Sequence, residues 1–571
     1  MRQLQLVVFA VVLKIISTSH RTFPYQVLSR LNGTDVEVRW KPDWERQVVH
    51  FSVQLSGSPI AWFLVGFSDH GKYRGSDFCK FDGVDVLDGY IARGLVMERD
   101  FQQDCIYYGR YRDGSFRFTR KFQTCDMRDY AIETGTTQLM IAIGLGDERS
   151  LNEATVSKEI TFSQLLPDDD GEYSPEDETD YQQISITAID AVIPNEVTTY
   201  WCAVARLNDI LLTKKHHIIK FEANITKGNE HLVHHMEIYQ CMNPGHDFEW
   251  LYNGNCNDEQ KPQELHGCSK VIAAWAFGAG PLVYPPEAGM PIGGPDFYPY
   301  VMVEIHYNNV EKVSGVVDNS GFTITYSDQL RPYDAGILEL GLIYSDANSI
   351  PPKQAAFPIT GYCVADCTQY FPLEGINIFA TQLHAHLTGR KLWTSHYRNG
   401  VKLGEINREN HYSPHWQHVN TLARPINVKP GDVLSTTCVF ETLNKKNFTW
   451  GGYGIEDEMC VNYIHYYPVS DVEVCKSAID NSTLREFFKQ MGINPTMEIN
   501  EMYKAVKWTA EGYSDLQELF SVGDLNIHCL QHDGDPFPHH PSGWEHVPQP
   551  EIRIGPFDKM RPPFECPAIN D

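Results

Sequence analysis

The sequence predicts an all-β protein built from antiparallel sandwiches or jelly rolls, with few helices, and those near the C-terminus. Two long stretches, residues 24–150 and about 182–475, contain many short runs of β type, such as "HFSVQL" at 50–55. Gly, Asp and Ser residues separate these runs and indicate turns. Helical spacing of apolar residues appears only near 483–491 and 514–520, so helices should be a minor component.

The composition indicates a folded, acidic protein of several domains. Its 571 residues suggest three or four domains, and 42% hydrophobic with 12% aromatic residues is typical of chains with real cores. The formal net charge of −27 argues against nucleic acid as a partner, because phosphates attract basic surfaces. Residues 165–181 should form an acidic, solvated linker after the first β region, since eight acidic and no basic residues lie between 168 and 180.

The first 19 residues have the pattern of a secretory signal peptide. Arg2 provides a positive start, "LVVFAVVL" at 6–13 an apolar core, and Ser17 and Ser19 are the small residues that follow. An uncleaved membrane anchor remains the alternative. The chain is therefore expected in the secretory pathway, either secreted or lumenal.

The cysteines and the sequons agree with that compartment. Fourteen cysteines, an even number, predict a disulfide framework in an oxidising environment. Four Asn-X-Ser/Thr sequons are candidate glycosylation sites: Asn32, Asn224, Asn447 and Asn481.

A first group of candidate metal ligands consists of histidines. "EHLVHHMEIYQC" contains the adjacent His234 and His235, whose side chains would point to opposite faces of a regular strand. Both can reach one ion only where the strand bulges or ends. "VMVEIHYNN" contributes His306, which shares a strand face with Met302 and Glu304.

A second group combines two histidines with a methionine. "TQLHAHLTGR" places His384 and His386 two residues apart, on one face of a strand, and Met459 follows a glycine-rich turn in "WGGYGIEDEMCVNYIHYYP". Two imidazoles and a thioether make a site soft enough for Cu(I), and three imidazoles also suit copper. Methionine is a poor ligand for zinc. Taken singly, each of these residues could also be an incidental core or surface residue.

At these positions the sequence resembles the copper type II, ascorbate-dependent monooxygenases. The resemblance is nearest to the dopamine β-hydroxylase group and its DBH-like monooxygenases, and it covers most of the chain, from about Tyr200 to Cys566. It rests on "HHIIKFEANITKGNEHLVHHMEIYQC", "YPPEAGMPIGGP", "GYCVADCTQY", "QLHAHLTGRKLW", "NHYSPHWQ" and "GIEDEMCVNYIHYYP". The N-terminal region is similar to the DOMON domain of that family, best in "FQTCDMRDY".

The resemblance implies a domain order. A DOMON sandwich would occupy residues 24–150, and two jelly-roll copper domains would occupy 182–335 and 336–500. Residues 501–571 would form a C-terminal extension tied back by disulfides.

It also implies two copper ions per chain and ascorbate as the reductant. His234, His235 and His306 match the ligands of the electron-transfer copper, and His384, His386 and Met459 match those of the oxygen-binding copper. Tyr200 and His384 match residues with catalytic roles, although the place of Tyr200 beside a cysteine makes a structural role equally plausible.

The resemblance implies a disulfide scheme as well, with Cys79 and Cys105 left over and paired inside the DOMON domain. The implied pairs are Cys125–Cys566, Cys202–Cys256, Cys241–Cys268, Cys363–Cys475, Cys367–Cys529 and Cys438–Cys460. Cys363 and Cys367 could instead form a C-x3-C metal motif. The cysteines that link subunits in the dopamine enzyme are missing near "NPTMEIN", so no inter-chain disulfide is expected, while a non-covalent homodimer remains open.

The substrate class depends on Gln382. Peptide-amidating relatives have an arginine there to bind a peptide carboxylate, and Gln382 offers no charge. This favours O2-dependent hydroxylation of a small, phenylethylamine-like amine. Tyr463 and Tyr466 could line an aryl pocket or simply pack in the β core, and Glu304 could face the amine or lie at the edge of the core.

Two other functions remain as alternatives. The chain could be a copper-binding paralogue without turnover of the dopamine type. It could also work through its DOMON domain as a haem-binding or sugar-binding protein.

Overall fold

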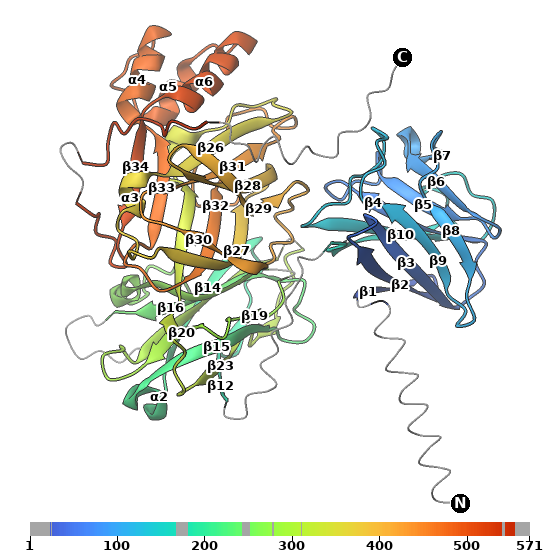
Figure 1. The fold of residues 1–571 in the computed structure, drawn as a ribbon, viewed down its shortest axis with the longest axis horizontal. Coiled ribbons are helices and arrows are strands. Elements are labelled where there is room, and N and C mark those ends of the chain that lie inside the picture. The colour runs from blue at the N-terminus through green and yellow to red at the C-terminus, as the bar shows by residue number, and fades with distance from the viewer. Residues whose placement is uncertain are drawn as a thin grey trace, which may run out of the picture. The chain divides into compact units, whose positions relative to one another are not determined.

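The computed structural model describes residues 23, 25–166, 181–242, 252–276, 279–309, 311–538 and 543–553. The expected signal peptide, nearly all of the expected acidic linker and Cys566 lie outside these residues. The described residues up to 166 form one compact unit together with Glu409–Tyr412, and the others form a second unit. Both consist mainly of antiparallel β-structure, which confirms the predicted all-β class (Figure 1).

The first unit contains two antiparallel sheets. One has the order β1 (Tyr25–Leu31), β2 (Thr34–Asp43), β3 (Val48–Gly57), β9 (Phe116–Lys121) and β8 (Ile106–Arg110). The other has the order β11 (Ser157–Ser163), β10 (Thr137–Gly144), β4 (Trp62–Ser68), β5 (Asp77–Phe81), β6 (Val86–Ile91) and β7 (Met97–Arg99).

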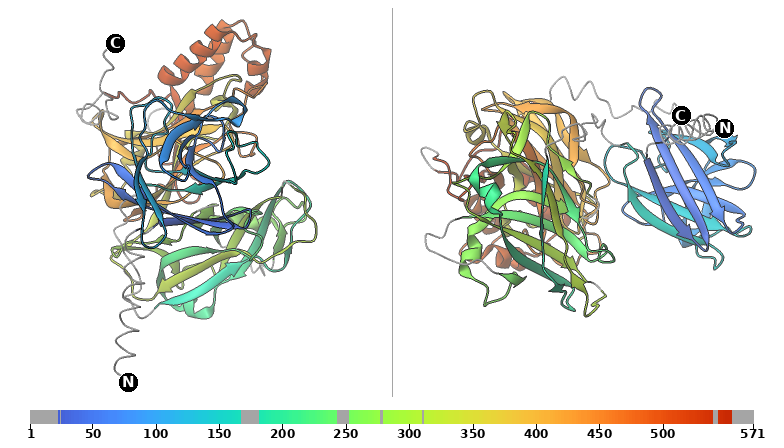
Figure 2. Two further views of the ribbon diagram at one scale, coloured as in Figure 1. Left: turned by 90° about the vertical axis from the view of Figure 1, so that its right-hand side faces the viewer. Right: turned by 90° about the horizontal axis from the view of Figure 1, so that it is seen from below.

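These two sheets pack face to face as a sandwich, whose strands Figure 2 shows from two further sides. Phe51 of β3 lies 5.9 Å from Phe67 of β4, measured between ring centroids, and Phe63 lies 5.3 Å from Phe116. Every residue of β4 and β10 is buried, because these central strands are covered on both faces. Alternation appears instead in β2, where Val36, Val38 and Trp40 point inward.

The first half of the second unit is also built from two main sheets. One has the order β12 (Gln182–Thr187), β23 (Gly321–Ser327), β15 (Lys215–Asn224), β20 (Ala288–Gly293) and β24 (Tyr333–Asp334), with β19 (Leu282–Val283) paired to β15. The other has the order β17 (Asn253–Asn255), β14 (Thr198–Arg206), β21 (Tyr300–Asn308), β16 (Val233–Cys241) and β18 (Cys268–Ala276). A separate two-stranded sheet pairs β13 (Ala191–Val192) with β22 (Val317–Asp318).

The second half of this unit is also built from two main sheets. Its larger sheet has the order β30 (Asn420–Val428), β27 (Ile376–Ala385), β32 (Cys460–Tyr467), β25 (Gly336–Leu342), β33 (Val474–Ile479) and β34 (Leu525–Leu530). Its smaller sheet has the order β26 (Phe357–Cys363), β31 (Val433–Phe440), β28 (Gly389–Arg398) and β29 (Val401–Glu409).

Three of the helices lie together at one end of this second half (Figure 1). They are α4 (Asn481–Gln490), α5 (Ile499–Ala505) and α6 (Ala510–Val522). The sequence predicted α4 and part of α6 but not α5. The N-cap of α4 is Asp480, whose Oδ1 accepts hydrogen bonds from the backbone N–H of Ser482 and Thr483. Two shorter helices are α2 (Asp209–Thr213) and α3 (Ala365–Thr368).

The two halves of the second unit share a hydrophobic core. Phe379, Ala380 and Tyr467 of the second half belong to the buried cluster of the first half. Phe379 lies 5.5 Å from Tyr284, measured between ring centroids. Side chains of both halves can therefore contribute to one site.

Six disulfide bonds connect cysteines among the described residues: five are pairs that the resemblance implies, and the sixth joins Cys79 and Cys105, the two cysteines that it left over. The six bonds are Cys79–Cys105, Cys202–Cys256, Cys241–Cys268, Cys363–Cys475, Cys367–Cys529 and Cys438–Cys460. Cys363 and Cys367 are thus engaged in separate disulfides, which leaves no C-x3-C metal motif. Cys125 is also disulfide-bonded, and its pairing with Cys566 remains a prediction.

The sequon asparagines are accessible on the surface. The side chains of Asn32, Asn224, Asn447 and Asn481 are all exposed. Within the described part of the chain, no helix has the length and apolar character needed to span a bilayer.

Candidate metal centres

The three histidines of the first group lie on two neighbouring strands, β16 and β21, whose pairing is interrupted by a register shift. His235 of β16 lies opposite His306 of β21, but the register of this pair shifts between Val233 and His235. His234 is the extra residue at the shift, so its ring can turn toward the side of His235. The condition under which two adjacent histidines can reach one ion is met.

The three rings present their Nδ1 atoms to one another. The Nδ1 atom of His235 lies 3.2 Å from Nδ1 of His234 and 3.3 Å from Nδ1 of His306. Nitrogen ligands at ~2.0–2.1 Å from a tetrahedral ion are about 3.3–3.4 Å apart. The spacing therefore fits three ligands of a single metal ion.

Burial keeps these rings neutral, as ligation requires. Burial first, and then neighbouring histidines, lower the pKa of His234 to about 4 and that of His306 to about 3. The same causes hold the pKa of His235 well below its ordinary value. At neutral pH each ring is therefore uncharged and has one nitrogen lone pair for a metal.

Tyr200 packs against this group. It lies opposite His306 in the pairing of β14 with β21, and the two rings stack with centroids 4.6 Å apart and planes 6° apart. Burial, followed by the charges of Glu304 and Glu237, raises the pKa of Tyr200 to about 12. Tyr200 is thus a neutral phenol in contact with a candidate ligand.

The second group lies at the end of β27 and immediately before β32, the strand that pairs with β27. Nδ1 of His384 lies 2.6 Å from Oε1 of Gln417, and Nδ1 of His386 lies 3.0 Å from the carbonyl oxygen of Asp457. Both partners are acceptors, so each Nδ1 donates a hydrogen and each Nε2 keeps its lone pair. The ring centroids are 5.2 Å apart, and Met459 lines the same cavity.

Glu458 connects the two segments that carry this second group. Its Oε2 accepts a hydrogen bond from the backbone N–H of His386 at 2.8 Å. Its Oε1 accepts from the backbone N–H of Thr388 at 2.5 Å and from the Thr388 hydroxyl at 2.7 Å. The carboxylate next to Met459 therefore holds the H-x-H segment in place.

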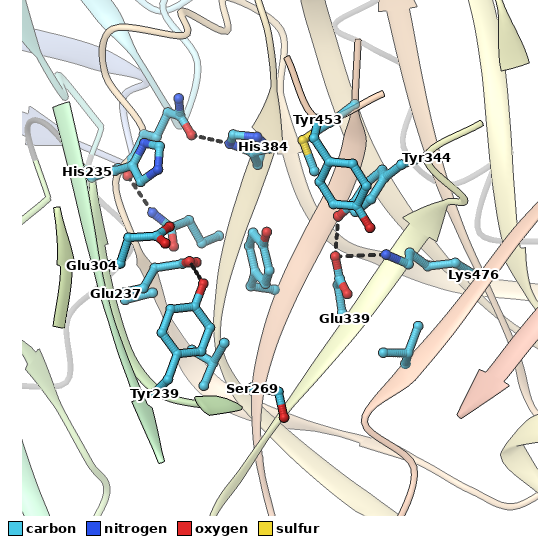
Figure 3. A pocket seen from close by; sticks show the side chains of 18 of the residues that line it. His235, Glu237, Tyr239, Ser269, Glu304, Glu339, Tyr344, His384, Tyr453 and Lys476 are labelled. Atoms are coloured by element: carbon cyan, nitrogen blue, oxygen red, sulfur yellow. Dashed lines mark hydrogen bonds and ion pairs between the residues drawn. The ribbon is translucent and has the colours of Figure 1, made fainter. Parts of the chain in front are cut away.

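A cavity of about 610 Å³ opens between the two halves and reaches both ligand groups. Figure 3 shows side chains of the first half on one side of it and side chains of the second half on the other. The first-half side comprises His235, Glu237, Tyr239 and Glu304, and the second-half side comprises Glu339, Tyr344, Tyr453 and Lys476. A volume in this range is typical of pockets for small molecules.

The carboxylates on the two sides differ in their neighbours. Glu339 forms an ion pair with Lys476 at 2.9 Å and accepts a hydrogen bond from the Tyr344 hydroxyl. Glu237, which accepts a hydrogen bond from the Tyr239 hydroxyl, lies opposite Glu304 in the pairing of β16 with β21. Burial and the charge of Glu237 raise the pKa of Glu304 to about 7, while Lys261 lowers it less strongly.

Gln382 and Tyr463 line this cavity, whereas Tyr466 does not. Tyr466 is fully buried in the core of the second half, so of the two alternatives, lining the aryl pocket or packing in the core, it follows the second. Residues three positions apart on β32 point to opposite faces of the sheet. The side chain of Gln382 donates a hydrogen bond to the carbonyl oxygen of Gln417 at 2.8 Å.

Sequence reasoning missed Gln417 and Glu458. Both belong to stretches that carry the resemblance, "NHYSPHWQ" and "GIEDEM". The only hint in the sequence was therefore that these two polar residues lie in the same stretches as, or close to, the suspected ligands. Their partners lie 33 and 72 positions away in the chain, so only the fold shows what they bind.

Comparisons with known proteins agree on one family. The model of the copper type II ascorbate-dependent monooxygenase N-terminal domain matches residues 184–314, and that of the C-terminal domain matches residues 333–488. The resemblance found in the sequence is thereby confirmed.

Similar proteins cover nearly the whole chain. Tyramine beta-hydroxylase of Caenorhabditis briggsae is 47% identical over 564 residues, which is 96% of this chain and 95% of that protein. Dopamine beta-hydroxylase of Rattus norvegicus is 38% identical over 93% of this chain and 87% of its own length. DBH-like monooxygenase protein 2 of Mus musculus is 32% identical over 83% of this chain and 77% of its own length.

Proposed function

The chain belongs to the copper type II, ascorbate-dependent monooxygenases, and from this premise we propose that it hydroxylates a small, phenylethylamine-like amine with O2. It is an enzyme that uses copper and ascorbate. The observation that carries the amine assignment is the pair of facing carboxylates, Glu237 and Glu304, in the cavity beside the ligand groups.

We assign one copper ion to His234, His235 and His306, and a second to His384, His386 and Met459. The converging Nδ1 atoms of the first group support three-coordinate binding through imidazole. The second group combines two free Nε2 atoms with a thioether, a donor set that suits Cu(I). Copper, when bound and reduced by ascorbate, supplies the one-electron chemistry for hydroxylation with O2.

The protein's own residues fix the ligands before any metal binds. Gln417 and Asp457 hold the protons of His384 and His386 on Nδ1, which directs Nε2 of both rings toward the metal. Glu458 fixes the backbone between them. Tyr200 limits the movement of His306 by stacking on its ring.

The substrate ammonium is proposed to bind between Glu237 and Glu304. Two like charges directly opposite each other on neighbouring strands are unfavourable, and a cation between them removes the repulsion. Glu339 is a weaker candidate because Lys476 already neutralises it. Lys476 is the one Lys or Arg among the residues that line the described cavity, so a peptide carboxylate would find no unpaired cation.

The compartment is part of the proposal. Six disulfides in the described chain indicate an oxidising environment. Exposed asparagines at all four sequons are compatible with glycosylation. Both observations support maturation in the secretory pathway.

The test is O2 uptake and product analysis with the copper-loaded, ascorbate-reduced protein. Tyramine-like amines should be hydroxylated, and glycine-extended peptides should not. Glu304→Gln should raise the KM for amines about 10- to 100-fold, the equivalent of a hydrogen bond to a charged group, with two copper ions still bound. Glu259→Gln, at an exposed glutamate of the same half, is the matched control. Turnover of the peptides alone would overturn the assignment.

A further inference from the structure

Gln382, the residue on which the predicted substrate class depends, lies on β27 two residues before His384. Side chains two positions apart on a strand share a face, and both residues line the cavity between the two halves. Gln382 is nevertheless almost fully buried, with 5% of its surface exposed. Its amide group must therefore find hydrogen bonds inside the protein.

The pairing of β27 with β30 ends just before Gln382. The last pair in register is Thr381 with Asn420, so Gln417, which precedes β30, lies beyond this ladder. The side-chain amide of Gln382 donates a hydrogen bond to the main-chain carbonyl oxygen of Gln417 at 2.8 Å. Gln417 is also only 5% exposed, and a buried carbonyl left without a partner would cost about 1–3 kcal/mol. A side chain thus takes the place of the next ladder bond.

The side chain of Gln417 makes the next contact. Its Oε1 accepts a hydrogen bond from Nδ1 of His384 at 2.6 Å, and its Nε2 donates to the carbonyl oxygen of Pro414 at 2.8 Å. Because a main-chain carbonyl can only accept, the amide nitrogen of Gln417 must face Pro414 and its oxygen must face His384. The proton of His384 therefore stays on Nδ1, and its Nε2 keeps the lone pair for a metal.

We propose that Gln382 is a positioning residue for the ligand His384 and that it acts through Gln417. The inference rests on the copper sites of the proposed function. Gln382 fixes the main chain of Gln417, and the side chain of Gln417 fixes the proton and the orientation of His384. Since His384 follows Gln382 on the same strand, the three residues form a closed ring of covalent and hydrogen-bonded links. Loss of the Gln382 amide would open this ring and leave His384 freer to turn.

Two substitutions of Gln382 test this role at different severity. Gln382→Met removes the amide but keeps an unbranched side chain of similar length. Gln382→Asn keeps the amide but withdraws it by one methylene from the Gln417 carbonyl, so this smaller change still decides if Gln382→Met does not fold. Gln417→Leu, alone and combined with Gln382→Met, shows whether the two glutamines act in series. Gln490→Met, at an exposed glutamine of α4 in the same half, is the matched control.

Competition with a chromophoric Cu(I) chelator gives a dissociation constant for each copper site, and Cu–S scattering in the X-ray absorption spectrum identifies the ion bound at Met459. Gln417→Leu should weaken the His384 site about 10- to 100-fold, as is usual for loss of a group that orients a ligand. Either substitution of Gln382 should weaken the same site about tenfold and leave the three-histidine site within about twofold of wild type. Added to Gln417→Leu, Gln382→Met should weaken the His384 site by less than about twofold more, because the contact through which Gln382 acts is already lost.

Three results would overturn the proposal. The first two are effects that simply multiply in the double variant and an equal weakening of both copper sites. In metal-free wild-type protein, 15N NMR should find His384 protonated on Nδ1, and Gln382→Asn should shift part of the population to the Nε2–H form. The third contrary result is a tautomer that Gln382→Asn leaves unchanged. This measurement needs no copper, so it still decides on Gln382 if wild type binds no copper through Met459, a failure that would count against the proposed sites.

Discussion

Single ligand atoms give the two proposed copper sites different preferences for the oxidation state of the metal. Three imidazoles surround the first, while the thioether of Met459 is one of three donors at the second. A soft sulfur donor favours Cu(I), the form that reacts with O2. The side chain is 8% exposed and lines the cavity, so its sulfur is accessible to a metal and to a small molecule.

Replacement of Met459 by His should leave two copper ions bound but lower turnover at least about tenfold. Imidazole is a harder donor than a thioether, so the site should shift its preference toward Cu(II). The comparison of Cu(I) and Cu(II) affinities, together with O2 uptake, measures both effects. Met242→His, at an exposed methionine, should change neither. Full turnover in the Met459 variant would mean that the sulfur is only a packing group.

The proposed ligand residues could be named from the sequence, because copper needs side chains of a few types and the family that the sequence resembles has motifs around them. The proton positions on their rings could not. These depend on Gln417 and Asp457, whose contacts with His384 and His386 are made only in the fold. For Tyr463 and Tyr466 the sequence left open whether each lines the pocket or packs in the core; because they lie three positions apart on β32, they face opposite sides of the sheet, and only Tyr463 lines the cavity.

At the scale of the elements, irregular strand ends bring the proposed ligands together where regular strands would not. The register shift at His234 brings adjacent residues to one side of β16. The disulfide Cys438–Cys460 joins β31 to the first residue of β32, Cys460, which directly follows Met459. Glu458, on the other side of Met459, holds the end of β27.

Glu458→Gln should lower the free energy of unfolding of the second half by about 1.5–3 kcal/mol, the usual contribution of hydrogen bonds to a charged group. The new NH2 would face one of the N–H or O–H donors that the carboxylate now accepts. Copper affinity at the His384 site should fall as well. Urea unfolding monitored by tryptophan fluorescence, with Cu(I) competition, tests both.

Glu456→Gln is the control for this substitution, since Glu456 lies in the same segment with its side chain 78% exposed. Its effect should stay within ±0.5 kcal/mol, as for most surface substitutions. Equal stability losses in the two variants would refute the special role of Glu458.

The whole molecule has two compact units, each with its own buried core. Such a chain should not unfold as one two-state system. The all-β class could be predicted from short alternating runs, but alternation marks only strands with one solvent face. The full burial of β4 and β10 follows from their places inside a sheet, which the sequence does not show. The helix α5 could not be predicted because its sequence has no strong helical periodicity.

Reduction of the disulfides should destabilise the second unit strongly. Cys363–Cys475 and Cys367–Cys529 close segments of 112 and 162 residues, and loss of a native disulfide typically costs about 2–5 kcal/mol. Differential scanning calorimetry with and without a thiol-free reductant measures the change. Unchanged unfolding temperatures after verified reduction would show that the cores suffice alone.

Within the first unit, one arginine faces a cluster of buried aspartates. Arg120 is fully buried and contacts the carboxylates of Asp77 at 2.6 Å and Asp129 at 3.0 Å. Asp88 lies beside them and is also fully buried. Burial first, and then the charge of Asp77, raise the pKa values of Asp88 and Asp129 to about 7.

This cluster predicts that the first unit of the metal-free protein is more stable in mild acid than at neutral pH. In the unfolded chain both carboxyls have a pKa near 3.9, so between pH ~4 and ~7 the folded state holds more protons than the unfolded state. Stability must therefore fall as the pH rises through that range, on the order of several kcal/mol for the two carboxyls together. Asp88→Asn should reduce this slope, because the amide does not titrate. Asp147→Asn, at an exposed aspartate, should not. The measurement is thermal unfolding of the full chain at pH 5, 6 and 7. If the unfolding temperature of Asp88→Asn depends on pH as strongly as that of wild type, these carboxylates are already ionised in the folded protein.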